Sequence, residues 1–523
     1  MKLSPFQLLF FFLIPLLCPP SVHAQTGLSP IQIDSLVEET RQVFNIPGIA
    51  VAVLKDGQEI VKKGYGIRSI ATHEKVDTQT IFGIASNTKA FTSAALAQLI
   101  DQGKIDWDTK VEDVLPEFKL YDPYVTREFT IRDLLTHRSG LGLGAGDLML
   151  WPTSNTTTMQ ELIHNLRYLK PVSSFRTKYD YDNLLYIVAG EVIARVSGKT
   201  YEEYLEQNIF KPLKMDRANL NLEVLKADPN RIYGHTQVGG KLKVLQHNPY
   251  SDITKAAGGI FASIDDMSKW VQARLNMGKY GPELQDSLFS VKQAKEMWAP
   301  QTIIPSGKDE YNTHFKAYGL GWRLQDAAGY LQVWHTGGLG GIVSKVMLVP
   351  ELNLGIVVLT NQEVGAAYEA IINSILDAYF GVQGKNRIQQ YQTARQQSFA
   401  NAHRIVRQVD QVLKQNDPGA GLKSAQILGR YKDAWFGEVI LTEEKDGQLY
   451  FSAIKSPDLS GPLQFYKGNT YVIKWDDPTI DANAYVLFSL DENGRAEGFK
   501  MKAISPLTDF SYDFQDLDFK RLN

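Results

Sequence analysis

Cysteine is almost absent from this chain. The one cysteine, Cys18, lies in an apolar stretch near the N-terminus, so the residues after it offer neither a disulfide nor a thiol nucleophile. Disulfides often stabilise small exported domains, and a chain of 523 residues that has none must depend on large hydrophobic cores instead. This length predicts two or three domains.

An excess of charge of either sign is also lacking. The 55 basic and 58 acidic side chains leave a formal net charge of −3. That balance gives no electrostatic reason to expect a nucleic-acid partner. After the N-terminal stretch, no run approaches the roughly 20 apolar residues that a membrane-spanning helix needs, so we expect no membrane span.

Several catalytic and cofactor motifs are missing as well. The chain has no H-E-x-x-H zinc motif, no G-x-S-x-G turn and no Walker loop, and its histidines show no metal-ligand spacing. The Gly-rich segment 142–146 does not open a helix after a strand, and we interpret it as a loop. We therefore expect neither a metal nor a cofactor.

The N-terminal stretch predicts a signal peptide over residues 1–24. A lysine at position 2 precedes an apolar run from Phe6 to Leu17, and small residues stand before Gln25. A lipoprotein anchor normally has a small residue before its cysteine, whereas Leu17 precedes Cys18 here. We expect a cleaved and exported protein, either periplasmic or secreted.

The remaining chain divides into three parts by pattern. Residues 25–380 mix helical and strand patterns, residues 381–425 are polar and keep helical spacing, and residues 426–523 alternate short strands with turns, which is typical of a small antiparallel barrel. In the first part we expect helices over 31–44, 86–100, 184–196, 201–213 and 364–380, and strands over 48–54, 59–63, 318–322, 332–335, 343–349 and 354–359.

The pattern S-x-x-K occurs twice. Ser86 and Lys89 begin a predicted helix, where residues three apart share a face and the amine can reach the hydroxyl. Ser452 lies in a predicted strand, where it and Lys455 point to opposite faces and cannot cooperate. A capping serine with a solvated lysine would also explain the first pair, so other motifs must decide.

Two further motifs follow in the chain. Tyr181-Asp182-Asn183 precedes a predicted helix, and His335-Thr336-Gly337 ends a predicted strand and opens a Gly-rich turn. Taken singly, each has an ordinary structural explanation, a half-buried aromatic residue and a strand-end histidine.

The order S-x-x-K, Y-x-N and [K/H]-T-G is the motif set of the serine penicillin-recognising superfamily. Over roughly residues 28–380 the chain resembles its class C beta-lactamase-like branch, which includes DD-carboxypeptidases, D-aminopeptidases and esterases. Residues 428–522 resemble the small β-barrel that is often fused to such hydrolases. The resemblance implies a two-lobed α/β (α+β) domain, with terminal helices on one face of an antiparallel sheet, a helical lobe on the other and the site between them.

The resemblance also implies catalytic roles. Ser86 would be the nucleophile of an acyl-enzyme, Tyr181 the general base and Lys89 its electrostatic partner, although the sequence leaves open which of the two accepts the proton. The backbone N–H groups of Ser86 and Gly338 would form an oxyanion hole.

Substrate would be held by the neighbouring motif residues. Asn183 would bind Lys89 and a substrate amide, and His335 would polarise the site or bind a carboxylate, with Thr336, Gly337 and Gly338 beside it. Two positions depart from the family pattern. Asp182 stands where serine is usual, and His335 stands where many beta-lactamases have lysine.

A histidine is largely neutral at pH 7, so His335 favours the peptidase and esterase members. The sequence thus predicts an exported serine hydrolase that acts on small peptides, including those with D-residues, or on esters. A beta-lactamase and a catalytically silent recognition protein are the alternatives, and a homo-oligomer stays open.

Overall fold

An eight-stranded antiparallel sheet forms the centre of the N-terminal part of the protein. The computed structural model describes residues 27–245, 250–307 and 310–522, so the predicted signal peptide lies outside the described residues. The strand order is β2-β1-β14-β13-β12-β11-β10-β9. The strands are β1 (Gly48–Lys55), β2 (Gln58–Gly66), β9 (Thr302–Ile304), β10 (Lys316–Tyr318), β11 (Arg323–Ala327), β12 (Tyr330–Leu339), β13 (Ile342–Val349) and β14 (Leu354–Thr360).

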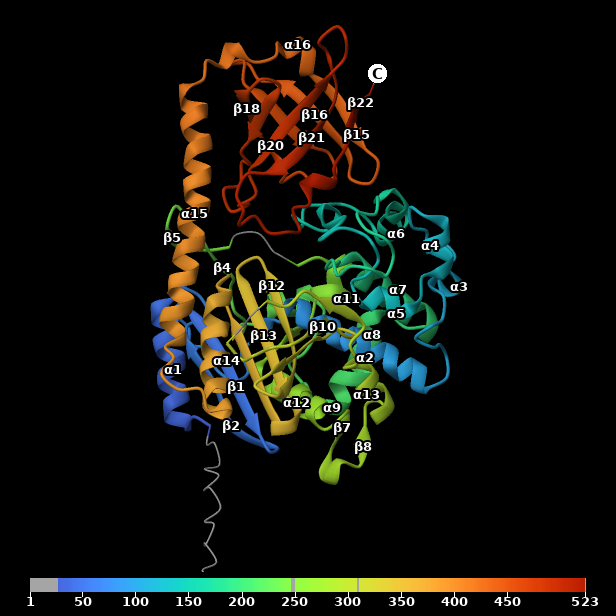
Figure 1. Ribbon diagram of the computed structural model, residues 1–523, viewed down its shortest axis with the longest axis vertical. Helices are drawn as coiled ribbons and strands as arrows, with labels where there is room; N and C mark the ends of the chain where they lie inside the picture. Colours follow the sequence, from blue (N-terminus) through green and yellow to red (C-terminus); the bar gives the residue numbers. More distant parts are fainter. Residues whose placement is uncertain (1–26, 246–249, 308–309, 523) are drawn as a thin grey trace, which may run out of the picture.

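Helices cover both faces of this sheet (Figure 1). Helices α1 (Pro30–Val43) and α14 (Gly365–Phe380) pack on one face against Val51 and Val358. The helical lobe packs on the other face, against Ala52 and its neighbours. Successive strand residues point to opposite faces, and helices cover both faces. Side chains on both sides of β1 are therefore buried, and its sequence is a continuous apolar run.

The helical lobe carries most of the functional segments. Its longer helices include α2 (Thr88–Asp101), α7 (Leu184–Ser197) and α12 (Ile264–Leu275). The shorter ones are α3 (Val111–Val114), α4 (Pro123–Glu128), α5 (Ile131–Leu135), α6 (Met159–Asn165), α8 (Tyr201–Leu205), α9 (Lys211–Leu213), α10 (Leu222–Ala227), α11 (Lys255–Gly258) and α13 (Val291–Met297). Three two-stranded sheets accompany them: β3 (Phe82–Gly83) with β6 (Phe261–Ala262), β4 (His235–Val238) with β5 (Lys241–Val244), and β7 (Lys279–Tyr280) with β8 (Asp286–Ser287).

A single long helix, α15 (Arg387–Gln415), leads from the sheet to the C-terminal part. At its start the Arg387 guanidinium binds the Asp377 carboxylate at 2.6 and 2.7 Å. Near its end Asp410 accepts a hydrogen bond from Lys474 of the barrel at 2.7 Å. Figure 1 shows the helix running beside both parts of the molecule.

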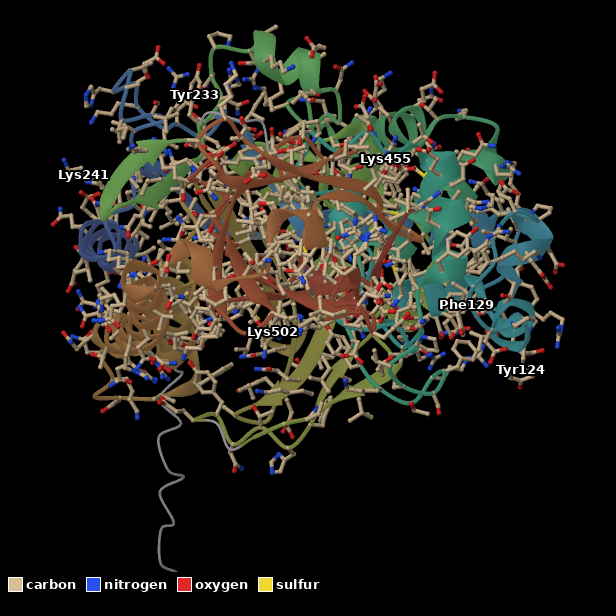
Figure 2. All side chains as sticks on the ribbon, turned by 90° about the horizontal axis from the view of Figure 1, so that it is seen from above. Tyr124, Phe129, Tyr233, Lys241, Lys455 and Lys502 are labelled. Carbon is tan, nitrogen blue, oxygen red and sulfur yellow. The ribbon has the colours of Figure 1, made fainter. Side chains whose placement is uncertain are left out.

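The C-terminal part is a closed eight-stranded barrel, preceded by helix α16 (Ser424–Ile427). Its strands are β15 (Gly429–Asp433), β16 (Gly437–Glu443), β17 (Leu449–Ala453), β18 (Ser460–Lys467), β19 (Thr470–Ile473), β20 (Ala484–Leu490), β21 (Ala496–Ala503) and β22 (Phe519–Arg521). Buried rings of Tyr431, Phe488 and Phe499 contact one another inside it. Side chains therefore fill a barrel of this size rather than leaving it open. Figure 2 looks down on it from above.

The structure confirms the predicted fold class and most predicted elements, with two corrections. Residues 318–322 are not one strand, because Gly321 turns there with a φ of +80° and separates β10 from β11. The His335-Thr336-Gly337 motif does not end its strand either, since β12 continues to Leu339. None of the helices within the described ranges has the length and apolarity required to cross a membrane.

Candidate active site

Ser86 lies on a strained turn between the two lobes. It belongs to the single helical turn η1 (Ala85–Asn87), and Ala85 has a φ of +47°, an uncommon conformation for a residue with a Cβ. The Asn87 amide donates to Ser344 of β13 at 2.8 Å and fixes the turn to the sheet. Every other residue from Ile81 to Leu99 is buried, whereas Ser86 is partly exposed. The turn thus presents one hydroxyl to a substrate.

Lys89 lies one helical turn further on and is fully buried. Its ammonium group donates to Ser86 Oγ at 3.1 Å, to Asn183 Oδ1 at 2.8 Å and to the Ala257 carbonyl at 2.9 Å. These contacts account for all three donor positions of a lysine. Burial lowers the pKa of Lys89 to about 7, although the nearby Asp147 and Asp182 act in the opposite direction. Close to neutral pH a substantial fraction of Lys89 is an uncharged amine.

Tyr181 lies beside this lysine, with the Lys89 nitrogen 4.8 Å from the centre of its ring. Burial raises the pKa of Tyr181 well above its usual value of 10, and a hydrogen bond to Ser86 offsets this only in part. We predicted tyrosinate as the base and Lys89 as its partner. The electrostatics favour the reverse assignment, in which the Lys89 amine accepts the proton and Tyr181 is a neutral phenol.

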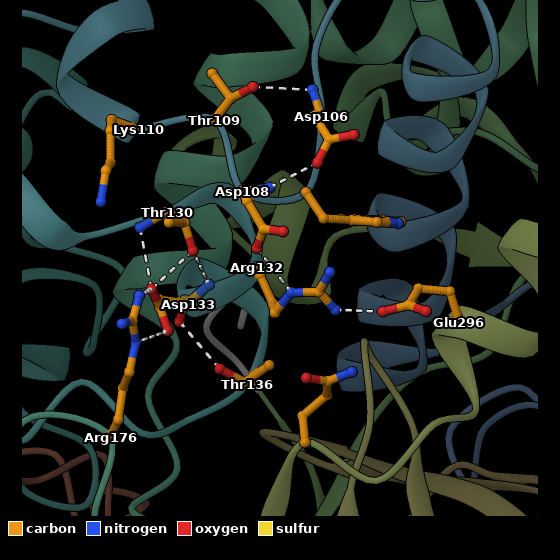
Figure 3. A network of polar contacts seen from close by, with 12 residues as sticks. Asp106, Asp108, Thr109, Lys110, Thr130, Arg132, Asp133, Thr136, Arg176 and Glu296 are labelled. Atoms are coloured by element: carbon orange, nitrogen blue, oxygen red, sulfur yellow. Dashed lines mark hydrogen bonds and ion pairs between the residues drawn. The ribbon is translucent and has the colours of Figure 1, made fainter.

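The segment that carries Tyr181 is tied to the loop after α5. Gly144 donates its backbone N–H to the Tyr181 carbonyl at 2.8 Å, so the Gly-rich loop that we interpreted as a connection also positions this residue. Behind it, the buried Asp133 accepts hydrogen bonds from Arg138 at 3.1 Å and Arg176 at 2.6 Å. Figure 3 shows the Asp133–Arg176 contact, together with the capping interaction of Asp133 with Thr130.

Asp182 does not face the cleft. It is fully buried, and its carboxylate accepts the Leu185 N–H at 3.4 Å in the first turn of α7. Its own N–H donates to Nδ1 of His137 at 3.1 Å. Burial raises the pKa of Asp182 to about 7. Its place in the motif is therefore explained by the helix N-terminus, where a carboxylate is favourable.

His335 is also buried, and both ring nitrogens have partners. Its Nδ1 lies 2.7 Å from the Thr336 carbonyl and must donate, so Nε2 accepts the Tyr318 hydroxyl proton at 2.9 Å. Burial, Arg323 and Lys89 all lower the pKa of His335 well below 6.5. A neutral ring engaged in this way is a poor ligand for a carboxylate, and it supports the Tyr318 side of the site instead.

The rest of the third motif forms the edge of β12 beside Ser86. A Cβ on Gly337 would lie 2.2 Å from the Ile84 carbonyl, so only glycine allows the strand to approach the Ser86 turn this closely. Gly338 is exposed, and Thr336 is half-buried. The pairing of β12 with β11 ends at Trp334, so among the described residues the next positions of β12 have no strand partner on that edge. Backbone groups at such an edge are free to bind a substrate.

Arg323 is a functional candidate that no motif indicated. Its guanidinium lies 5.5 Å from the Tyr179 ring and 5.9 Å from the Tyr181 ring. Within the described ranges, its buried Nε has no hydrogen-bond partner. The site therefore has a fixed positive charge, supplied from β11 rather than from the third motif. The sequence carried no signal for it beyond its position after the Gly321 turn.

Asp147 is a second residue that the sequence analysis missed. Its Oδ2 accepts Asn183 Nδ2 at 2.7 Å and the Ser511 hydroxyl at 2.9 Å. Asn183 thereby joins Lys89 to a buried carboxyl group whose pKa burial raises well above 3.8. Ser511 comes from the C-terminal barrel, 364 residues further along the chain. In the part of the chain that the structure covers, no cluster of three or more His, Cys, Asp or Glu residues is arranged to bind a metal.

Two protein families match the chain. The Beta-lactamase family model matches residues 33–379, and the model of a domain of unknown function, DUF3471, matches residues 415–521. The first match holds Ser86, Lys89, Tyr181 and His335, and the second holds the barrel.

Curated relatives and solved structures agree with the first match. The unguisins hydrolase ungD' of Aspergillus campestris is 30% identical over 358 residues, covering 65% of this chain and 64% of that protein. The unguisins hydrolase ungD of Aspergillus violaceofuscus is 27% identical, covering 79% and 77%. Protein flp of Staphylococcus aureus is 28% identical, covering 64% of each chain. This chain thus spans less than two thirds of the first and third relatives.

Solved structures show the same fold. The octameric penicillin-binding protein homologue from Pyrococcus abyssi superposes with a TM-score of 0.60 at 22% identity, over 94% of this chain and all of that one. A class C beta-lactamase superposes with a TM-score of 0.54 at 21% identity, over 68% of this chain and 96% of that one. At these identities the likeness concerns the fold.

Proposed function

Because this chain belongs to the Beta-lactamase family, we propose that it is a serine hydrolase that cleaves small peptides or esters through an acyl-enzyme on Ser86. The observation that carries the proposal is the contact between Ser86 Oγ and the Lys89 nitrogen, 3.1 Å apart on a partly exposed turn. A serine hydroxyl needs an adjacent base, and a lysine with a pKa of about 7 is such a base near neutral pH.

In the proposed first step Ser86 attacks a substrate carbonyl while the Lys89 amine takes the hydroxyl proton. The Oγ–carbon bond forms, the bond from the carbonyl carbon to the leaving group breaks, and the leaving group receives the proton. Tyr181 is a neutral phenol that is hydrogen-bonded to Ser86, and it is placed to pass this proton to the leaving group. Water then hydrolyses the acyl-enzyme by the same route in reverse.

The positive charge of Arg323 favours substrates that carry a carboxylate. This side chain lies beside Tyr181 and its buried Nε has no hydrogen-bond partner in the described chain, and His335 is neutral and engaged elsewhere. A peptide with a free C-terminus meets this requirement, with D- or L-residues. The two relatives named unguisins hydrolases agree with hydrolysis as the reaction.

Export is part of the proposal, resting on the predicted signal peptide over residues 1–24. Assembly with further copies of this chain is also proposed, because the Pyrococcus abyssi homologue is described as octameric. Secretion of the full chain and its mass in solution by light scattering test these two points.

Labelling with a fluorophosphonate tests the catalytic proposal. We expect Ser86 to be labelled in the unmodified protein, and mass spectrometry of the labelled peptide identifies the residue. A library of peptides with D- or L-residues at each end then defines the substrate. An unlabelled but folded protein would contradict the proposal.

Replacing Arg323 tests the binding of a carboxylate. A charged hydrogen bond contributes about 1.5–3 kcal/mol, so Arg323→Ala should lower kcat/KM for a carboxylate-terminated peptide by roughly 10- to 100-fold. The matched substrate is the same peptide with an amidated C-terminus, for which the loss should be much smaller. Equal losses for both peptides would remove Arg323 from substrate recognition.

Efficient turnover of a chromogenic cephalosporin by the unmodified protein would instead favour the beta-lactamase alternative.

A further inference from the structure

A loop of the C-terminal barrel reaches the active site. This barrel loop, residues 504–518, joins β21 to β22 on the side of the barrel that faces the catalytic domain (Figure 1). Its Phe510 ring stands edge-on to the ring of Tyr181, with the ring centres 5.7 Å apart and an angle of 81° between the planes. A side chain of the second domain therefore touches a residue of the candidate catalytic site.

Buried hydrogen bonds hold the loop in this position. Asp513 is fully buried and accepts the Gly146 N–H at 2.6 Å and the Leu148 N–H at 3.0 Å. The Ser511 hydroxyl donates to Asp147 at 2.9 Å. A buried backbone N–H without a partner costs about 1–3 kcal/mol, so these hydrogen bonds favour the docked position of the barrel loop.

The loop and the catalytic domain also approach each other closely. Gly144 has a φ of +69°, and a Cβ at this position would lie 2.6 Å from the Phe510 carbonyl. The Gly-rich loop thus contacts Tyr181 on one side and the barrel loop on the other. Only a glycine at position 144 therefore allows the barrel loop to lie this close to the loop that holds Tyr181.

Three exposed apolar side chains accompany this contact: Phe510 itself, which touches Tyr181, and two residues in or beside the Gly-rich loop. Phe510 is 38% exposed, Leu143 46% and Val172 59%. The methyl groups of Val172 lie 3.6 and 3.7 Å from a Cβ built on Gly142, so its side chain packs beside the same Gly-rich loop. These three residues, here called the apolar rim, come from three separate segments, and the Asp516 carboxylate of the barrel loop borders them, 3.8 Å from the same Cβ position. Exposed apolar groups gathered at a functional site are commonly a binding surface.

We propose that Phe510 is a specificity-determining residue, and that the apolar rim binds an apolar or aromatic group on the acyl part of the substrate. This inference rests on the proposed function, since it assigns a substrate class to the acyl-enzyme of Ser86. It makes the barrel part of the active site. The barrel interior is filled by its own rings, so its contribution lies in the loop.

The test compares two esters with the same leaving group. In the full-length protein, kcat/KM is measured for p-nitrophenyl phenylacetate and p-nitrophenyl acetate. Phe510→Ala should lower the preference for the phenylacetate about tenfold, the size of effect that one apolar contact produces in specificity. Phe510→Leu should restore part of the preference, because an apolar side chain is again present.

Leu487→Ala is the matched control. Leu487 is 41% exposed on β20 of the same barrel, so its loss removes a similar apolar surface away from the barrel loop. Its ester preference should stay within about twofold of the unmodified protein. An unchanged preference in Phe510→Ala with intact labelling of Ser86, or an equal change in both variants, would overturn the inference. Absence of Ser86 labelling in the unmodified protein would overturn the proposed function as well.

Discussion

The two S-x-x-K segments of this chain share a pattern but differ in secondary structure and in the partners of their lysines. Ser86 and Lys89 lie on successive helical turns, and the hydroxyl and amine are 3.1 Å apart. Ser452 lies on β17, opposite Ile440 and Ser460 of the neighbouring strands. Lys455 follows the end of that strand and binds Glu161 of α6 at 2.6 Å.

Exposure does not distinguish the two serines, since both are partly buried. The distinction comes from backbone period and environment. A helix brings the third residue onto the same face, and burial then lowers the pKa of Lys89 to about 7. Lys455, labelled in Figure 2, is a surface lysine whose ion pair joins the barrel to the helical lobe.

The largest expected difference is between the two serines. Ser86→Ala should lower kcat for a p-nitrophenyl ester at least about a thousandfold, because a serine hydrolase without its nucleophile keeps only the contribution of the surrounding site. Ser452→Ala should leave this rate within about twofold. Equal losses in the two variants would show that the helical placement does not define the nucleophile.

The next expected effect is a pH dependence of the acylation rate, which should arise from the Ser86–Lys89 pair alone. The pKa of Lys89 is lowered, so the amine is protonated below about pH 7 and becomes a proton acceptor above it. Acylation of the unmodified protein should therefore rise about tenfold between pH 6 and pH 8.

Single-turnover acylation by a p-nitrophenyl ester, followed by stopped flow, measures this rise. The Lys455→Ala variant serves as the control and should give the same profile. A rate that does not change between pH 6 and pH 8 would remove Lys89 as the base.

The smallest expected effect concerns Lys455, the lysine of the second S-x-x-K segment. The ion pair of Lys455 and Glu161 joins side chains that are 33% and 43% exposed, and such pairs contribute about 0–1 kcal/mol. Lys455→Ala should therefore change the thermal transition of the protein by only a few degrees and leave ester hydrolysis intact. Loss of hydrolysis in this variant would mean that the second pair takes part in the reaction.

The sequence could predict what depends on local pattern. Helical spacing after Ser86 and the continuous apolar run over residues 48–54 predicted two elements, and the structure has them as α2 and β1. The family resemblance that the three motifs carry implied that Ser86, Lys89, Tyr181 and Asn183 meet. Their contacts bridge residues that lie 94 positions apart, which no local period could reveal.

The sequence could not predict the pKa shifts that burial causes, or the contacts between residues far apart in the chain. The sequence predicted Tyr181 as the base and Lys89 as its partner and left open which of them accepts the proton, and the burial of the two side chains favours Lys89. Arg323 follows an ordinary turn, so its place over the Tyr181 ring has no signature in sequence. Phe510 and Ser511 reach the site from a separate domain, more than 300 residues away along the chain.

Helix α15 gives the association of the two domains a geometric basis. It has 29 residues and, at about 1.5 Å per residue, spans roughly 43 Å. Both ends are held, by Asp377 of α14 and by Lys474 of the barrel. A stiff spacer of fixed length keeps the barrel loop at a high effective concentration over the catalytic domain, so weak individual contacts suffice for docking. The helix thus sets the separation between the domains, and the buried hydrogen bonds of the barrel loop fix where they meet.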